Sequence, residues 1–366
     1  MRIEGAIVRN SNEFEFADLE LDSPRSDEIL VRIMAAGICH TDVAILEGDI
    51  PWPRPALLGH EGAGIVAAVG ADIEDIRPGD RVVLSFASCG TCEQCSAGAV
   101  SYCMDFATLN FSGRRRDGSH SCHLDGQPVG ASFFSQSSFA SYALARRSNV
   151  VKVSSDLPLA MLAPLGCGIQ TGAGAVLNRL RPAPGTSIAV FGLGAVGLSA
   201  ILAAALIGCY PIVAIDLHDQ RLDLARELGA THVLRGDCAA LLDELRSISG
   251  NGFAYAVEAT GLPGVMASAA TCLRKTGEVV LLGVPASREI PFPSSIMRGA
   301  TIHTCVEGDS NPHEMIPRLI DLHHSGDFPF EKMIKTFDFT NINAAVEAMK
   351  DGSVIKPVLL IGEEAA

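Results

Sequence analysis

Two cysteines and one histidine, in well-separated parts of the chain, have side chains that could bind one metal ion. They are Cys39, His60 and Cys167. Zinc binds thiolate sulfur and imidazole nitrogen, and a catalytic zinc site combines three protein ligands with one open coordination position. A free cysteine is more often a small buried apolar residue than a ligand. Because three suitable donors are present, we predict that the fold brings them together around a catalytic zinc ion.

Two acidic residues stand close to these candidate ligands. Asp42 lies three positions after Cys39, and Glu61 directly follows His60. A zinc-bound imidazole commonly donates its second N–H group to a carboxylate, which fixes the tautomer of the ring. We therefore predict that Asp42 accepts a hydrogen bond from His60. The alternative is that both acids are ordinary surface carboxylates.

A second group of cysteines is closely spaced in the sequence. It consists of Cys89, Cys92, Cys95 and Cys103. Four thiolates leave no open position, so this spacing predicts a structural zinc site in a lobe formed by residues 89–103. The alternative is an iron–sulfur cluster, although the Cys-Pro ending of the bacterial ferredoxin pattern is absent.

The stretch that follows this lobe is rich in glycine, serine and charged residues, which predicts a loop. It contains the basic run Arg114–Arg116, which we interpret as solvated. It also contains His120, Cys122 and His123. With no fourth donor nearby, we expect these three residues to lie in a flexible insertion and not at a third metal site.

A glycine-rich turn begins the second half of the chain. Its residues are Gly192-Leu193-Gly194-Ala195-Val196-Gly197. It follows the apolar strand pattern of residues 187–191 and precedes the helical pattern of residues 198–207, and Asp216 ends the next strand pattern. In this setting the turn predicts a dinucleotide site, with the pyrophosphate at the helix N-terminus and Asp216 on the ribose 2′-hydroxyl. The carboxylate would repel a 2′-phosphate, so NAD is predicted in preference to NADP.

Strand and helix patterns alternate from this turn to about residue 282, which predicts a doubly wound parallel sheet. Ligands bind such sheets at the carboxyl ends of the strands, where we expect Thr260 and Val284. Residues before the turn read as short strands and turns. The expected fold is therefore α/β, with a Rossmann domain and a mostly β domain.

The expected domain boundaries follow from these patterns. Residues 1–168 form the catalytic domain, and residues 169–305 form the dinucleotide-binding domain. Residues 306–366 return to the catalytic domain and end in a strand.

Length and composition favour a globular protein without nucleic-acid or membrane partners. The chain has 366 residues, of which 48% are hydrophobic, and a formal net charge of -14. Duplex binding needs many Lys and Arg residues to neutralise phosphates, so we expect no nucleic-acid partner. The apolar run 188–215 is broken by glycines and reads as strand, turn, helix and strand, so no membrane span is expected. Because the chain begins without a signal-peptide pattern, we expect a cytoplasmic location.

These motifs together resemble those of the zinc-containing medium-chain alcohol dehydrogenases, and most closely the aryl-alcohol dehydrogenases. The resemblance covers almost the whole chain. It is carried by Gly37–Asp42, Gly59–Gly64, the four-cysteine lobe, Leu109–Phe111, Gln136–Phe139, Pro164–Gly174, the glycine turn and Glu307–Ser310. It implies a GroES-like catalytic domain and the oxidation of a primary, benzyl-type alcohol to the aldehyde with hydride transfer to NAD. The cofactors implied are NAD and two zinc ions per subunit, one catalytic and one structural.

The resemblance also assigns roles to individual residues. It places a catalytic zinc on Cys39, His60 and Cys167, with Glu61 near the metal and Thr41 in contact with the substrate oxygen. It implies cofactor contacts at Thr171 and Val284 (nicotinamide), Arg221 (adenosine ribose) and Lys356 (pyrophosphate).

Some questions stay open at this stage. Ala44 occupies the position at which well-studied relatives carry a proton-transferring histidine, so His40 or ordered water could take that role. A terpenoid alcohol such as geraniol, S-hydroxymethylglutathione or a polyol would suit the same chemistry. Zinc-free quinone reductases and a non-catalytic NAD-binding protein are further alternatives. We expect a homo-oligomer, a dimer or a tetramer, that acts on a small alcohol or aldehyde.

Overall fold

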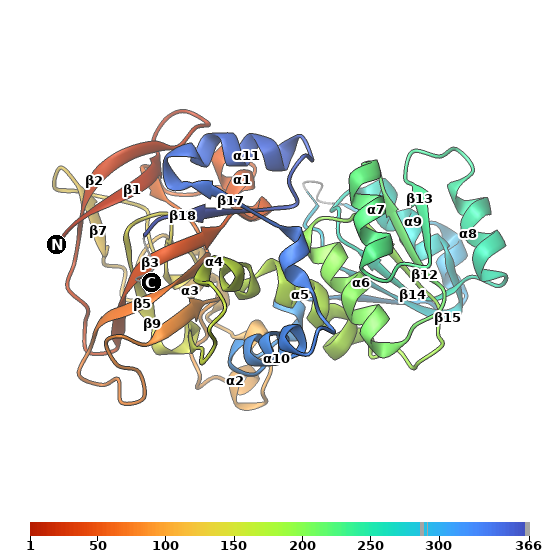
Figure 1. Ribbon diagram of the computed structural model, residues 1–366, viewed down its shortest axis with the longest axis horizontal. Helices are drawn as coiled ribbons and strands as arrows, with labels where there is room; N and C mark the ends of the chain where they lie inside the picture. The colour runs from red at the N-terminus through yellow and green to blue at the C-terminus, as the bar shows by residue number, and fades with distance from the viewer. Residues whose placement is uncertain (286–288, 291, 363–366) are drawn as a thin grey trace. The chain divides into compact units, whose positions relative to one another are not determined.

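The structure is a computed structural model that describes residues 1–285, 289–290 and 292–362 (Figure 1). The chain folds into two compact units. Unit 1 contains Met1–Cys167, Asn311–Ile320 and the described residues from Met333 onward, and unit 2 contains Gly168–Ser310 and Asp321–Lys332. Two expected segments extend beyond the described residues. They include residues 286–288 and 291 of the expected dinucleotide domain and residues 363–366 of the expected C-terminal segment.

Unit 1 consists mainly of two β-sheets. The first has the strand order β4-β1-β2-β7-β8. Its strands are β1 (Arg2–Val8), β2 (Glu15–Leu21), β4 (Ala56–Leu57), β7 (Cys122–Leu124) and β8 (Gln127–Pro128). The second has the order β10-β6-β5-β3-β18-β17, with β9 also paired to β3. Its strands are β3 (Glu28–Gly37), β5 (Glu61–Val69), β6 (Arg81–Leu84), β9 (Tyr142–Arg146), β10 (Val150–Lys152), β17 (Ile334–Asp338) and β18 (Lys356–Leu360).

Short helices connect these strands. In unit 1 they are α1 (His40–Glu47), α2 (Glu93–Ser96), α3 (Phe106–Phe111), α4 (Leu159–Leu162) and α11 (Ile342–Lys350). Helix α10 (Pro312–His324) begins in unit 1 and ends in unit 2.

Strand β3 is the centre of the second sheet. It pairs with β5, β9 and β18, and nearly all of its residues are buried, because the apolar run Ile29–Gly37 packs on both faces of the sheet. Its register with β5 pairs Gly37 with Glu61. The chain therefore leaves β3 toward Cys39 at the same edge at which it enters β5 from His60.

Unit 2 has one parallel sheet with the strand order β13-β12-β11-β14-β15-β16. This is the 3-2-1-4-5-6 order of a dinucleotide-binding fold, which confirms the predicted fold class. The strands are β11 (Ile188–Phe191), β12 (Ile212–Asp216), β13 (His232–Arg235), β14 (Phe253–Glu258), β15 (Leu273–Leu281) and β16 (Thr301–Thr304). The helices that accompany the sheet are α6 (Ala195–Ile207), α7 (Asp219–Glu227), α8 (Leu241–Ser249) and α9 (Pro263–Thr271), and α5 (Gly168–Gly174) packs against α6 (Figure 1).

The apolar run 188–215 forms β11, α6 and the start of β12, as predicted. In the described part of the chain no single helix is long and apolar enough to cross a membrane. One bent pair, Leu159–Gly166 with Gly168–Leu180, meets that criterion by length and composition alone.

The predicted loop after the four-cysteine lobe is more ordered than expected. Arg115 is buried, and its guanidinium bonds to both carboxylate oxygens of Glu28 at 2.7 and 3.0 Å and to Asp22 at 2.6 Å. Cys122 is fully buried on β7, which pairs with β2. The expectations of a solvated basic run and a flexible insertion were therefore wrong for Arg115 and Cys122. Sequence composition could not show the partners that Arg115 finds on distant strands.

We predict that Arg115→Met lowers the free energy of unfolding by about 3 kcal/mol or more, because it leaves the Glu28 carboxylate buried without its partner. Arg116→Met is the matched control. Arg116 is exposed and pairs with Asp105, so its loss should cost less than about 1 kcal/mol. Urea denaturation of the two variants measures the difference, and equal midpoints would contradict a stabilising role for the buried pair.

Candidate metal sites and dinucleotide turn

The structure brings Cys39, His60, Glu61 and Cys167 together within unit 1. One potential ligand atom from each lies within 4.8 Å of the others. Cys39 is the N-cap residue of α1, and His60 and Glu61 stand at the start of β5. Cys167 follows the short helix Ala163–Gly166. The predicted convergence of two sulfurs and one ring nitrogen is thus present in the structure.

Asp42 connects two of these ligand segments. Its carboxylate accepts hydrogen bonds from the backbone N–H groups of Cys39 and Gly59, both at 3.0 Å, and lies 3.2 Å from Nδ1 of His60. The side chain of Asp42 is fully buried. The predicted contact between Asp42 and His60 is therefore found, together with two backbone contacts that the sequence did not predict.

The remaining ring nitrogen of His60 fits a metal ligand. Nε2 is buried and has no hydrogen-bond partner among the described residues. A buried polar atom without a partner is costly, and a neutral imidazole that donates through Nδ1 has its lone pair on Nε2. This nitrogen and the nearby thiol groups form a donor set suited to zinc.

The surrounding charges favour the ionised form of Cys39. A hydrogen bond with Cys167 lowers the pKa of the Cys39 thiol most, burial opposes this shift, and His60 and Lys356 lower the pKa further. Burial works against a charged His60, but Asp42 and Cys39 outweigh it and raise the pKa of the imidazole. Thiolates bind metal ions whereas thiols do not, so this environment prepares Cys39 for that role.

Glu61 is paired with a lysine in this group. The Lys356 ammonium donates to both carboxylate oxygens of Glu61 at 2.9 Å and to the carbonyl of Ile38 at 3.0 Å. Burial raises the pKa of Glu61, and Lys356 opposes that rise. The resemblance placed Lys356 on the cofactor pyrophosphate; the structure places it beside Glu61, so the pyrophosphate contact stays a prediction.

The two residues after Cys39 differ in exposure. The Thr41 hydroxyl lies 3.9 Å from the Cys39 sulfur and is therefore next to the ligand group. His40 is exposed at the first position of α1. The roles of Thr41 and His40 in proton transfer stay predictions.

Sequence reasoning missed the aromatic side chains around His60. The ring of Phe134 stacks on the imidazole with centroids 4.5 Å apart, and Phe133 contacts it edge-on at 4.9 Å. Trp52 packs on the outer side of Phe133. The only signal in the sequence was that Phe133 and Phe134 precede the Gln136–Phe139 motif.

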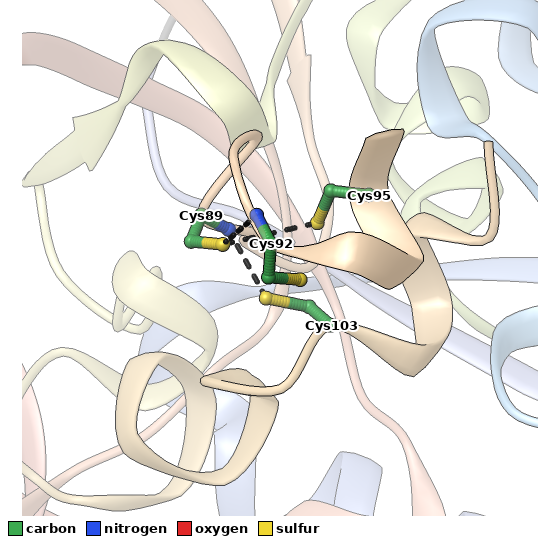
Figure 2. A group of neighbouring side chains, drawn as sticks. All are labelled: Cys89, Cys92, Cys95 and Cys103. Carbon is green, nitrogen blue, oxygen red and sulfur yellow. Dashed lines mark hydrogen bonds between the residues drawn. The ribbon is translucent and has the colours of Figure 1, made fainter. Parts of the chain in front are cut away.

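The four cysteines of the lobe form a second donor group. Their sulfur atoms lie within 4.8 Å of one another and point toward a common centre (Figure 2). Backbone N–H groups of Cys92 and Cys89 donate to the sulfurs of Cys89 and Cys103 at 3.3 and 3.2 Å. Hydrogen bonds from Thr91 and Cys92 lower the pKa of Cys89 to about 6. Four converging sulfurs with N–H donors suit a closed, tetrahedral zinc site.

The glycine turn of unit 2 has the geometry that a dinucleotide needs. Gly192 has a φ of +87°, and a Cβ on Gly197 would lie 1.8 Å from the Gly192 carbonyl oxygen. A Cβ on Gly194 would meet no described atom within 4 Å, so space is open next to the turn. Helix α6 starts directly after Gly194 without a side-chain cap. Its first N–H groups are therefore suited to bind a phosphate.

Asp216 is tied to this turn. Its carboxylate accepts hydrogen bonds from the backbone N–H groups of Leu193 at 2.6 Å, Leu217 at 2.8 Å and His218 at 2.9 Å. Arg221 lies 3.9 Å from it. Of the predicted ribose-binding residues, Asp216 is thus at the carboxyl end of β12, next to the glycine turn, and Arg221 is near the start of α7.

The other predicted cofactor residues in unit 2 come from three further segments, of which Thr260 lies directly beside Gly192 of the turn. Thr260 follows β14 and donates its hydroxyl hydrogen to Glu258, and Val284 follows β15 with 84% of its surface exposed. Thr171 is on α5, where its hydroxyl lies 3.4 Å from the carboxylate of Glu307. The cofactor contacts of these residues stay predictions.

Comparison with known proteins agrees with these features. The alcohol dehydrogenase GroES-like domain family matches residues 25–155, and the zinc-binding dehydrogenase family matches residues 195–325. A geraniol dehydrogenase of Castellaniella defragrans is 44% identical over 93% of both chains.

Two solved structures are similar over 99% of this chain and 100% of their own. An alcohol dehydrogenase zinc-binding domain protein from Burkholderia ambifaria is 43% identical, with a TM-score of 0.96. Benzyl alcohol dehydrogenase from Acinetobacter calcoaceticus is 40% identical, with a TM-score of 0.95. The predicted cofactors, zinc and NAD, are confirmed at the level of the family. This chain therefore belongs to the zinc-containing medium-chain alcohol dehydrogenases.

Proposed function

We propose that this protein oxidises a primary, benzyl-type alcohol to the aldehyde, reversibly, with hydride transfer to NAD. The observation that carries the proposal is the convergence of Cys39, His60 and Cys167, in which Nε2 of His60 has no hydrogen-bond partner among the described residues. In this proposal these three residues hold the catalytic zinc, with Glu61 beside it. Cys89, Cys92, Cys95 and Cys103 hold the structural zinc.

When bound, zinc would supply a Lewis acid for the alcohol oxygen and NAD would supply the hydride acceptor, which the side chains lack. The side chains of the protein orient the metal ligand His60 and move the substrate proton. Asp42 keeps the His60 ring in the tautomer whose Nε2 carries the lone pair. Thr41, with its hydroxyl beside Cys39, takes the substrate hydroxyl proton as it gives up its own hydroxyl hydrogen to His40. His40, exposed next to it, passes this proton to solvent.

The surroundings of His60 favour an apolar substrate. Phe133 and Phe134 cover the imidazole on one edge and one face. The polar side chains of Ser135, Gln136 and Ser137 bond to backbone atoms and offer no groups to a polyol. A substrate with several hydroxyl groups would lose its hydrogen bonds to water here, whereas an aromatic or terpenoid alcohol would not.

A terpenoid alcohol such as geraniol is the second candidate substrate. The geraniol dehydrogenase at 44% identity favours it, just as the benzyl alcohol dehydrogenase structure at 40% identity favours the aromatic one. Both alcohols are primary, unsaturated next to the reacting carbon and apolar. The same residues would therefore serve either one.

The two metal sites predict the zinc content of the protein. The purified wild-type chain should contain two zinc ions, and Cys39→Ser and Cys92→Ser should each contain one, because each removes one sulfur ligand from a different site. Cys209→Ser is the control, since Cys209 is buried in unit 2 outside both groups. Elemental analysis after dialysis measures the zinc content. One zinc ion or none in the wild type would refute the two-site assignment.

The substrate proposal is tested by NADH absorbance with benzyl alcohol, geraniol, ethanol, sorbitol and S-hydroxymethylglutathione. We expect kcat/KM for benzyl alcohol to exceed that for ethanol by at least about 100-fold, because several apolar groups add binding energy in the transition state. Cys39→Ser should abolish turnover but retain NADH binding. Preference for sorbitol or S-hydroxymethylglutathione would contradict the apolar assignment. Absence of turnover with every alcohol would favour a non-catalytic NAD-binding protein.

Asp216→Ala should reduce the preference for NAD over NADP by about 10- to 100-fold, which is the range for losing a charge-assisted hydrogen bond to the ribose. Asp219→Ala is a suitable control, because Asp219 is exposed and pairs with Arg235. The measured quantity is the ratio of kcat/KM values for the two cofactors. An unchanged ratio in Asp216→Ala would count against the ribose contact.

A further inference from the structure

Residues 132–138 adopt an unusual backbone conformation next to the metal ligand His60. Four residues that are not glycine have positive φ angles: Ser132 (61°), Phe134 (51°), Ser135 (52°) and Ser137 (57°). The left-handed region is uncommon for such residues, and it persists only where the surrounding structure holds it in place. Such clusters often occur at functional sites.

The contacts of this segment explain what holds it. Ser138 and Phe139 donate their backbone N–H groups to the carbonyls of Gly59 and Leu58 at 2.9 and 3.0 Å. The hydroxyl of Ser137 donates to the carbonyl of Leu57 at 2.6 Å. The segment is thus bonded residue by residue to the stretch that leads into His60.

Gln136 makes the contacts nearest to the metal ligand. Its Nε2 donates to the carbonyl of His60 at 2.9 Å and to the carbonyl of Ser85 at 3.0 Å. Its Oε1 accepts from the N–H group of Gly62 at 3.1 Å. Only 3% of the residue is exposed. One buried amide therefore bonds to the peptide groups on both sides of Glu61, directly after His60.

The same segment also restrains the ring of His60. Phe134 lies nearly parallel to the imidazole, with an angle of 23° between the planes, and Phe133 lies at 77° to it. Asp42 restrains Nδ1 in the plane of the ring. The ring direction is set by these three side chains, and the backbone from which the ring projects is set by Gln136.

We propose that Gln136 is a positioning residue for the metal ion at Cys39, His60 and Cys167, acting through the backbone that directly follows His60. The proposal rests on the proposed function only in taking these three residues as the metal site. The left-handed residues occur in the segment that places the Gln136 amide between His60 and Ser85 and stacks Phe134 on the imidazole. The contacts of the Gln136 side chain are with the backbone next to the metal ligand.

The test uses cobalt(II) in place of zinc, because its visible absorption reports ligand geometry and needs no turnover. Gln136→Met keeps the side-chain length and removes all three hydrogen bonds. We expect a changed cobalt spectrum and a Kd for the metal, measured by chelator competition, that is raised about 10- to 100-fold. Cys39→Ser, which retains only the four-cysteine site, provides the spectrum to subtract.

The matched control is Asn343→Leu. Asn343 is another amide of unit 1 that bonds to backbone, with both contacts at Phe14. A general loss of stability would affect both variants in thermal unfolding, whereas only Gln136→Met should change the cobalt spectrum and the Kd. If both quantities equal the wild-type values in Gln136→Met, the proposal is wrong.

A second variant covers the case in which Gln136→Met does not fold. Gln136→Glu keeps the acceptor for Gly62, loses the donor to His60 and Ser85 and sets an acceptor oxygen against their carbonyls, so a raised Kd is expected. A wild-type Kd would overturn the proposal. Because no alcohol is present in these measurements, failure of the substrate proposal would appear separately, as absent turnover in the wild type.

Discussion

The carboxylate of Asp42 is the group on which the candidate active site depends. It is fully buried and is satisfied by two backbone N–H groups and a ring nitrogen, which come from Cys39, Gly59 and His60. A buried charge is tolerated only when its hydrogen bonds are made. The same contacts that stabilise Asp42 therefore fix the distance between the two chain segments that carry the first two candidate ligands. Stability and site geometry have a common origin here.

The charged side chains of the candidate active site also depend on one another for their stability. When both thiols are ionised, Cys39, Cys167, Asp42 and Glu61 are anionic, and Lys356 is the cation bonded to Glu61. A divalent ion would offset much of the remaining negative charge. This explains how four acidic or sulfur-containing side chains can share a buried site. Without compensating positive charge, burying these negative charges together would be strongly destabilising.

The two units contribute different kinds of chemistry. Unit 1 supplies side-chain donors for metal ions at the ends of strands and helices. The buried amide of Gln136 bonds to the backbone next to one of these donors, His60. Unit 2 supplies mainly backbone, through the turn at Gly192 and the uncapped N-terminus of α6. Metal ligands need particular atoms at particular distances, whereas a pyrophosphate needs N–H groups and space.

Spacing and periodicity are local properties of the chain, so they were sufficient to predict the donor types, the glycine turn with Asp216 and the α/β fold class. They also identified Asp42 as the partner of His60. Contacts between distant atoms could be found only in the folded protein: Lys356 with Glu61, Phe134 on the imidazole, Gln136 on the backbone of His60, and Arg115 with Glu28. From composition alone, Arg114–Arg116 was interpreted as a solvated loop. Arg115 is buried because it pairs with the carboxylates of Asp22 and Glu28, which are distant in the sequence. Such contacts depend on strand register and backbone strain, which arise from the whole fold and leave no periodic pattern in the sequence.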